Sequence, residues 1–255
     1  EPHCFFLDSG MDAQRLGRYS FIGSQPFLAF RSKGKSIWLD WGNHVERRSG
    51  NPFDTLREIL DRFQSPPLPR NLPFAGGGIG YLGYPLCHFI EDLPSTTYDA
   101  LELPDCYLAF YDVVVAFDHQ SNKVYLCQSH VGEGCAKRPQ QQIEKLRSIL
   151  GLATQQIGKL ENVPFRITPR ASGNRHSSLV TRHSSIRSNF TKGEYLSTVQ
   201  RAKKYIAAGD IYQVNLSQRF SAEIELPPVE LYTRLRQLSP TPFGAYLHCG
   251  DFQIL

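Results

Sequence analysis

The sequence predicts an α+β fold in which antiparallel strands predominate and helices interrupt them. Short β-branched or aromatic runs such as YSFIG (19–23) and KSIWLDW (35–41) are separated by Gly, Ser and Asp, as in strands joined by tight turns. Other segments carry apolar residues at helical spacing and end at Pro or Gly. With 255 residues, of which 41% are hydrophobic, the chain is long enough to bury a core.

Residues 1–150 are predicted to form a strand-rich N-terminal domain. FFLDSG (5–10), YSFIG, PFLAF (26–30) and KSIWLDW indicate a meandering antiparallel sheet. NPFDTLREILDRF (51–63) predicts a helix that ends before three prolines. Its expected buried face consists of Phe53, Leu56, Leu60 and Phe63.

The same domain is expected to end with a hairpin and a helix. YDVVVAF (111–117) and KVYLCQSH (123–130) flank the turn DHQSN, which favours a β-hairpin. PQQQIEKLRSIL (139–150) predicts a helix stopped by Gly151.

Residues 151–189 are rich in Ser and Arg without a sustained period, and we interpret them as a linker. Because almost no aromatic residues lie between the arginines, an RNA-binding role is disfavoured. Residues 190–255 are expected to begin a second domain. Thr191 and Glu194 predict a capping box, and the helix would present Tyr195, Val199, Ala202 and Ile206 before it stops at Gly209.

The stretch GDIYQVNLSQRF (209–220) predicts a strand with two different faces. Side chains alternate along a strand, so Tyr212, Val214, Leu216 and Phe220 would face the core. Gln213, Asn215 and Arg219 would face the other way, and burial without partners would cost about 1–3 kcal/mol each. We expect these three to support a cleft. After this stretch, Pro228 with LYTRLRQL predicts a helix, and GAYLH with DFQIL predicts a strand pair.

Several classes of protein are disfavoured. Gly78, Gly80 and Gly83 have dinucleotide-loop spacing, but Pro85 opposes the helix which that motif requires, so a bent strand is the better interpretation. The net charge of +4 is spread along the chain, which demands neither a nucleic-acid nor a membrane partner. The six cysteines form no Cys-x-x-Cys pair and are expected to be reduced thiols. No signal peptide or membrane span is evident, which predicts a cytoplasmic location.

Three segments together resemble the chorismate-utilising enzymes, namely the first components of aminodeoxychorismate synthase and anthranilate synthase. They are AAGDIYQVNLSQRF (207–220), FAGGGIGYLGY (74–84) and SPTPFGAYL (239–247). Asn215 and Ala245 resemble the aminodeoxychorismate branch more closely, as does LPDCYLAFYDVVVAFDH (103–119).

The resemblance implies an α+β fold with sheets packed face to face and helices outside. It also implies that chorismate is aminated to 4-amino-4-deoxychorismate, a folate precursor, by ammonia from a glutamine amidotransferase subunit, with Mg²⁺ as cofactor. The alternatives are anthranilate synthesis and a module that binds tryptophan without catalysis. The family's catalytic and Mg²⁺-binding residues are expected beyond Leu255, so the chain would be an inactive fragment. Pro85 also departs from the family's usual Asp.

The resemblance further implies a small pocket for tryptophan between the sheets. A zwitterionic amino acid needs polar partners for both of its charged groups and apolar walls for its side chain. The matching motifs are Asp8-Ser9-Gly10, residues 16–19 and residues 242–244. A structural turn with core aromatic residues accounts for the same motifs equally well. The predicted contact residues are Ser9, Leu16, Gly17, Arg18, Tyr19, Pro242, Phe243 and Gly244.

Overall fold

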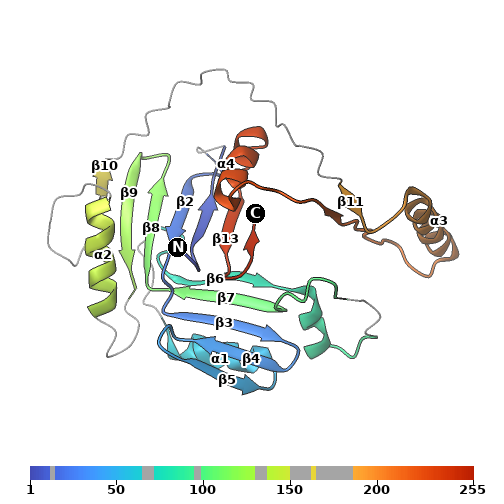
Figure 1. The fold of residues 1–255 in the computed structure, drawn as a ribbon, viewed down its shortest axis with the longest axis horizontal. Helices are drawn as coiled ribbons and strands as arrows, with labels where there is room; N and C mark the ends of the chain where they lie inside the picture. Colours follow the sequence, from blue (N-terminus) through green and yellow to red (C-terminus); the bar gives the residue numbers. More distant parts are fainter. Residues whose placement is uncertain (12–14, 65–71, 95–98, 130–136, 150–161, 165–185) are drawn as a thin grey trace. The chain divides into compact units, whose positions relative to one another are not determined.

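The computed structural model describes residues 1–11, 15–64, 72–94, 99–129, 137–149, 162–164 and 186–255 (Figure 1). The chain forms two compact units. The first combines Glu1–Thr168 with Pro228–Leu255, and the second is Pro169–Pro227. These units differ from the predicted boundaries at 150 and 190, because the last 28 residues belong to the first unit. Most of the predicted linker lies outside the described residues.

The first unit contains a seven-stranded sheet in the order β10-β9-β8-β2-β1-β13-β14. Its strands pair antiparallel throughout. Their bounds are Asn162–Pro164 (β10), Lys123–Gln128 (β9), Val113–Asp118 (β8), Tyr19–Gly23 (β2), Phe5–Asp8 (β1), Gly244–His248 (β13) and Gln253–Ile254 (β14). The predicted hairpin is confirmed as β8–β9, and the predicted C-terminal strand pair as β13–β14.

A second antiparallel sheet has five strands in the order β5-β4-β3-β7-β6. Their bounds are Val45–Ser49 (β5), Ser36–Asp40 (β4), Leu28–Lys33 (β3), Cys106–Tyr111 (β7) and Gly77–Leu82 (β6). The glycine-rich stretch is therefore a strand. A Cβ on Gly80 would lie 1.9 Å from the carbonyl oxygen of Tyr107, so this position requires a residue without a side chain. The short 3₁₀ helix Tyr84–Phe89 follows.

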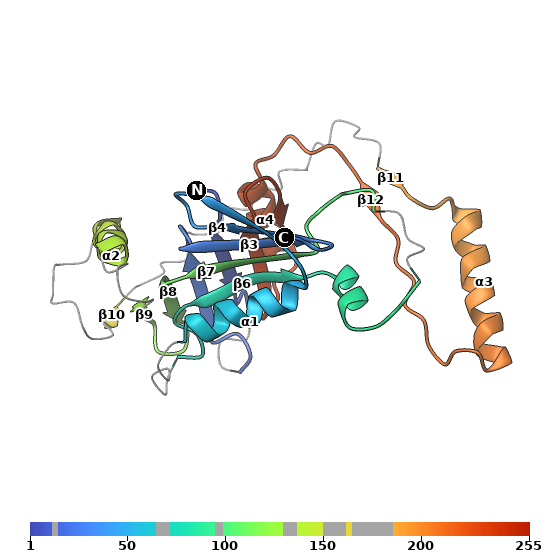
Figure 2. The same ribbon diagram turned by 90° about the horizontal axis from the view of Figure 1, so that it is seen from below.

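The alternation of side chains along β7 explains how the layers stack. Tyr107, Ala109 and Tyr111 join a core shared with the seven-stranded sheet, which also contains Phe5 and Leu247. Cys106 and Phe110 point to the opposite face. There they pack with a second core that includes residues of the helix α1 (Pro52–Arg62). The sheets thus pack face to face with α1 outside (Figure 2), which confirms the predicted fold class.

The three helices predicted for this unit are present in the structure. Helix α1 (Pro52–Arg62) begins after Asn51, whose side chain accepts a hydrogen bond from the amide of Phe53. Its buried apolar residues are Pro52, Leu56 and Ile59, whereas Leu60, predicted for this face, is 59% exposed. The prediction that Leu60 is buried is wrong, because the buried stripe of the helix runs through Leu56 and Ile59 and leaves Leu60 at the edge of that stripe. Helices α2 (Lys137–Ile149) and α4 (Pro228–Leu238) are confirmed.

The second unit is described over residues 186–227. It contains helix α3 (Lys192–Ala208) and a two-stranded ladder of β11 (Arg187–Ser188) and β12 (Phe220–Ser221). The capping box is confirmed, with Thr191 accepting from the amide of Glu194 at 3.2 Å, and Gly209 ends the helix in the left-handed conformation. None of the residues of α3 is buried.

Candidate functional site

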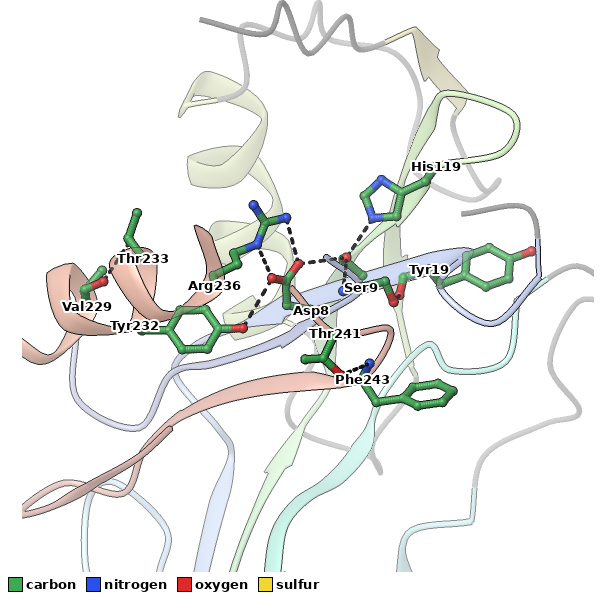
Figure 3. Close-up of polar contacts among 11 residues, drawn as sticks. Asp8, Ser9, Tyr19, His119, Val229, Tyr232, Thr233, Arg236, Thr241 and Phe243 are labelled. Atoms are coloured by element: carbon green, nitrogen blue, oxygen red, sulfur yellow. Dashed lines mark hydrogen bonds and ion pairs between the residues drawn. The ribbon is translucent and has the colours of Figure 1, made fainter. Parts of the chain in front are cut away.

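The carboxylate of Asp8 is the centre of a polar network where β1 ends (Figure 3). Asp8 is only 4% exposed. The Tyr232 hydroxyl donates to Oδ2 at 3.3 Å, and Arg236 Nη2 donates to Oδ1 at 3.2 Å. Arg236 Nε also donates to Oδ2. The buried negative charge is therefore held by two side chains that lie one turn apart on α4.

Hydrogen bonding to Asp8 and burial shift the pKa values of the two side chains on α4. Hydrogen bonding to Asp8 raises the pKa of Arg236 above its ordinary value. Burial, reinforced by the charge of Asp8, raises the pKa of Tyr232 to about 12. Both side chains therefore stay protonated at neutral pH, and each can keep donating to the carboxylate.

The hydroxyl of Ser20 connects this carboxylate to the neighbouring strands. Ser20 is 2% exposed and accepts from the amide of Ser9 at 3.0 Å. Its Oγ lies 2.7 Å from His119 Nε2 and 3.5 Å from Asp8 Oδ1. Burial lowers the pKa of His119 below its ordinary value, which favours the neutral imidazole at this contact. The network thus spans β1, β2, the β8–β9 turn and α4.

Arg18 and Asp118 form a second ion pair nearby. Arg18 donates from Nε to Oδ1 at 3.1 Å and from Nη2 to Oδ2 at 2.8 Å, the bidentate geometry of a strong pair. Burial alone would raise the pKa of Asp118. Hydrogen bonds from Arg18 and Ser121 outweigh it and bring the pKa to about 2. Asp118 also accepts from the amides of Gln120 and Ser121, so it fixes the hairpin turn.

The two predicted halves of the tryptophan pocket come together in the structure. The amide of Gly10 donates to the carbonyl of Thr241 at 2.9 Å, and Asp8 is paired with Gly244 between β1 and β13. A Cβ on Gly244 would lie 3.0 Å from the Tyr232 hydroxyl, so glycine allows that hydroxyl to approach Asp8. The motifs 8–10 and 242–244 are therefore neighbours although they are far apart in sequence.

The remaining predicted contact residues mostly have partners within the fold. Ser9 donates its hydroxyl to the carbonyl of Tyr19 at 2.6 Å, and the Arg18 guanidinium lies 4.8 Å from the ring centroid of Tyr19. Leu16 and Phe243 are 59% and 72% exposed, so neither lines an enclosed cavity within the described residues. Residues 12–14, which precede the predicted contact residues 16–19, lie outside the described residues. Tryptophan binding stays a prediction.

A Cβ on Gly17 would meet the carbonyl oxygen of Met11 at 1.9 Å. Gly17 therefore permits a close backbone approach, and a side chain at this position would collide with the backbone of Met11.

The strand predicted for residues 209–220 is wrong over most of its length. Only Phe220 and Ser221 are in a strand, and Tyr212, expected in the core, is 92% exposed. A strand forms only where a neighbouring strand takes its backbone hydrogen bonds. Within the described residues β11 pairs with Phe220 and Ser221 of β12, and this pairing does not extend back along residues 209–219. Gln213 and Asn215 contact each other at 3.4 Å, and the Arg219 amide donates to Asn189 Oδ1 at 2.7 Å. The side chains of Gln213, Asn215 and Arg219 are all exposed, and their predicted supporting role stays untested.

Sequence reasoning missed the residues that complete the Asp8 network. Tyr232 and Arg236 are four positions apart in LYTRLRQL, the spacing that puts two side chains on one helix face, and this signal could have been noticed. Ser20 and His119 carry no comparable signal, because their meeting depends on the pairing of β2 with β8.

The described residues contain no group of three or more His, Cys, Asp or Glu side chains placed to hold a metal ion. They likewise contain no helix that is both long and apolar enough to cross a membrane. The five described cysteines are unpaired, and Cys106, Cys127 and Cys249 are buried.

Comparison with solved structures defines the class of fold. Anthranilate synthase component I from Streptococcus pneumoniae TIGR4 superimposes with a TM-score of 0.67 over 92% of this chain and 49% of that chain, at 23% sequence identity. This likeness shows that the two-sheet arrangement is that of an anthranilate synthase component I.

Sequence comparison identifies the family. Residues 2–255 match the family described as chorismate binding enzyme, and the chain belongs to this family. It is 31% identical to anthranilate synthase component 1 of Acetivibrio thermocellus over 99% of this chain and 50% of the relative. It is 34% identical to that of Thermus thermophilus (98% and 48%), and 28% identical to aminodeoxychorismate synthase component 1 of Bacillus subtilis (96% and 48%). The chain thus spans about half the length of these relatives.

Proposed function

We propose that the protein acts on chorismate and replaces a ring hydroxyl by ammonia-derived nitrogen. The observation that carries this proposal is the family match over residues 2–255, almost the whole chain. The relatives named as synthases of anthranilate and aminodeoxychorismate support the same reaction class. Because the chain spans only half of those relatives, the proposal concerns the protein to which these residues belong.

Two products are compatible with this reaction class. Asn215 and Ala245 support 4-amino-4-deoxychorismate, because both residues resemble the aminodeoxychorismate branch of the family. Relatives named anthranilate synthase at 31% and 34% identity support anthranilate instead, which requires amination at a different ring carbon and loss of pyruvate. The two products differ chemically, so one assay separates them.

The proposed reaction needs a nitrogen source and a divalent cation. The relatives are named as component 1, which supports a second component, and we propose a glutamine amidotransferase in that role. Mg²⁺ would neutralise the substrate carboxylate during the reaction. The described residues offer no acidic cluster that fits this ion, so no step is assigned to Mg²⁺ on this chain.

The test uses the protein as its gene encodes it, incubated with chorismate, ammonium and Mg²⁺. Anthranilate is detected by its fluorescence and 4-amino-4-deoxychorismate by chromatography with mass detection. Either aminated product supports the proposal, and its identity selects the branch. Consumption of chorismate without an aminated product, or no consumption in the presence of an active amidotransferase, contradicts it.

We also propose that the region where residues 8–10 meet residues 242–244 binds a free amino acid of the tryptophan type. The support is the contact between Gly10 and Thr241, which brings the two predicted motifs together. Calorimetric titration of the chain with tryptophan should show saturable binding that Ser9→Ala and Pro242→Ala weaken. Equal affinity in both variants would place the site elsewhere, and absence of heat with the wild-type chain would remove the proposal.

A further inference from the structure

The hydroxyl of Ser20 contacts several polar groups but has only one proton to donate. Its Oγ accepts from the amide of Ser9 at 3.0 Å, which uses one of the two acceptor positions of a hydroxyl. His119 Nε2 lies 2.7 Å and Asp8 Oδ1 lies 3.5 Å from the same Oγ (Figure 3). Because both of these atoms can accept, the hydroxyl proton serves only one of them at a time.

The distances assign this proton to His119 while its imidazole is neutral. A separation of 2.7 Å is typical of an O–H donor, whereas an N–H donor usually stays about 2.9–3.0 Å from its acceptor. The contact with Asp8, at 3.5 Å, lies at the outer limit of a hydrogen bond. His119 Nε2 is therefore the acceptor, and the proton of the neutral imidazole is on Nδ1.

Charged groups from three elements act on this imidazole. Asp118 precedes it at the end of β8, Asp8 faces it from β1, and Arg236 faces it from α4. Tyr232, also on α4, stays uncharged because its pKa is raised to about 12. Burial has the largest effect and lowers the pKa of His119, Arg236 lowers it further, and the two carboxylates raise it. The imidazole is therefore neutral at neutral pH. Because its side chain is partly exposed, solvent can protonate it at lower pH.

We infer that His119 is a proton switch that redirects the hydroxyl of Ser20 to Asp8. Once Nε2 carries a proton from solvent, it donates to Ser20 Oγ at the second acceptor position of that oxygen. The hydroxyl then turns its own proton to Asp8 Oδ1 and becomes a further donor to this carboxylate, beside those from α4. The hydroxyl keeps its proton throughout, and the amide of Ser9 keeps its acceptor in both states.

The switch connects the β8–β9 turn to the attachment of α4 through a single hydroxyl. While His119 is neutral, the side chains that hold Asp8 most closely belong to α4, and protonation adds a donor from β2. Lowering the pH therefore strengthens the contact between the carboxylate and β2. The switch needs neither the proposed reaction nor the proposed amino-acid site, because all of its members lie in the first unit.

The tautomer of His119 tests the inference in the unmodified 255-residue chain. Long-range proton–nitrogen NMR spectra of histidine-labelled protein distinguish a protonated from an unprotonated ring nitrogen. We expect Nδ1 to be protonated and Nε2 unprotonated at about pH 7.5, and both to be protonated once the pH falls below the pKa of His119. A neutral imidazole with its proton on Nε2 overturns the inference, because the hydroxyl of Ser20 would then donate to Asp8 in both states.

A matched pair of serine substitutions tests the link to Asp8. The chemical shift of the Asp8 carboxyl carbon should change as His119 titrates in the wild-type chain. In Ser20→Ala this change should fall at least about 3-fold, because only the through-space effect of the imidazolium remains. Ser129→Ala removes a half-buried hydroxyl that donates to the carbonyl of Asp112 in the same unit, so it should keep the full change. An unchanged response in Ser20→Ala, or an equal loss in both variants, contradicts the inference.

Discussion

Asp112 immediately precedes the strand β8 and Asp118 is its last residue; both are buried, yet their surroundings shift their pKa values in opposite directions. Asp118 accepts hydrogen bonds from Arg18 and from the hairpin turn, and its pKa falls to about 2. Asp112 is 1% exposed, its ion-pair partner Arg138 lies 3.6 Å away, and burial raises its pKa. The number of donors facing each carboxylate decides the difference.

Asp118→Asn should therefore destabilise the fold at neutral pH. The folded-state pKa is lower than the unfolded one, so the stabilisation is present above about pH 4 and is lost as pH falls toward about 2. We expect a loss on the order of 2 kcal/mol at pH 7, because a charged acceptor is removed from the turn. Urea unfolding at pH 7 and pH 2.5 measures the gap. A loss equally large at both values would mean that shape, not charge, matters here.

Asp112→Asn should instead stabilise the fold at neutral pH. A raised folded-state pKa means that the ionised carboxylate weakens the fold above that pKa, and that the penalty disappears as the pH falls through it. We expect the substitution to raise the free energy of unfolding by about 1 kcal/mol at pH 7 and by less at pH 5. Exposed Asp61→Asn is the control, and it should change neither value. A destabilised Asp112→Asn at pH 7 would show that Arg138 compensates the charge fully.

At the scale of elements, the Asp8 network is what attaches helix α4 to the seven-stranded sheet. Tyr232 and Arg236 face Asp8 from the helix, while Ser20 faces it from β2. Removing the guanidinium leaves a buried carboxylate without its cation, which costs more than the intact pair contributes.

Arg236→Met should lower the unfolding free energy by about 2 kcal/mol, less than for a fully buried pair because the Arg236 side chain is 43% exposed. Asp8→Asn combined with Arg236→Met should recover part of this loss, since no charge is then left unpaired. Chemical denaturation of the four proteins of the cycle gives the coupling. Additive losses in the double variant would show that the two side chains act independently.

At the scale of the whole molecule, the core between the two sheets holds β1, β7, β8 and β13 in one unit. Phe5 is 1% exposed in this core, with its ring 4.6 Å from that of Tyr111, whereas the neighbouring Phe6 points to the other face of the same strand. Replacing each phenylalanine by alanine therefore compares the same substitution on the two faces of one sheet.

Phe5→Ala should destabilise the first unit by about 3–5 kcal/mol through the cavity it leaves, and Phe6→Ala by clearly less. Thermal and urea unfolding followed by tyrosine fluorescence measure both. Similar losses for the two variants would contradict the assignment of the shared core to the face that carries Phe5.

Local signals in the sequence determined the elements that depend on residues close to one another. The capping box at Thr191, the end of α3 at Gly209 and the β8–β9 hairpin all formed as predicted. Each depends on hydrogen bonds between residues a few positions apart, so the pattern is written in one short stretch.

Tertiary structure alone decided the pairing of β1 with β13 and therefore the first unit and the Asp8 network. Phe5 and Leu247 are paired across almost the whole chain, and no local pattern specifies that register. The same reason explains the error at residues 211–219. Their alternating side chains predicted a strand, but a strand exists only beside another strand, and the sequence of the segment does not contain its partner.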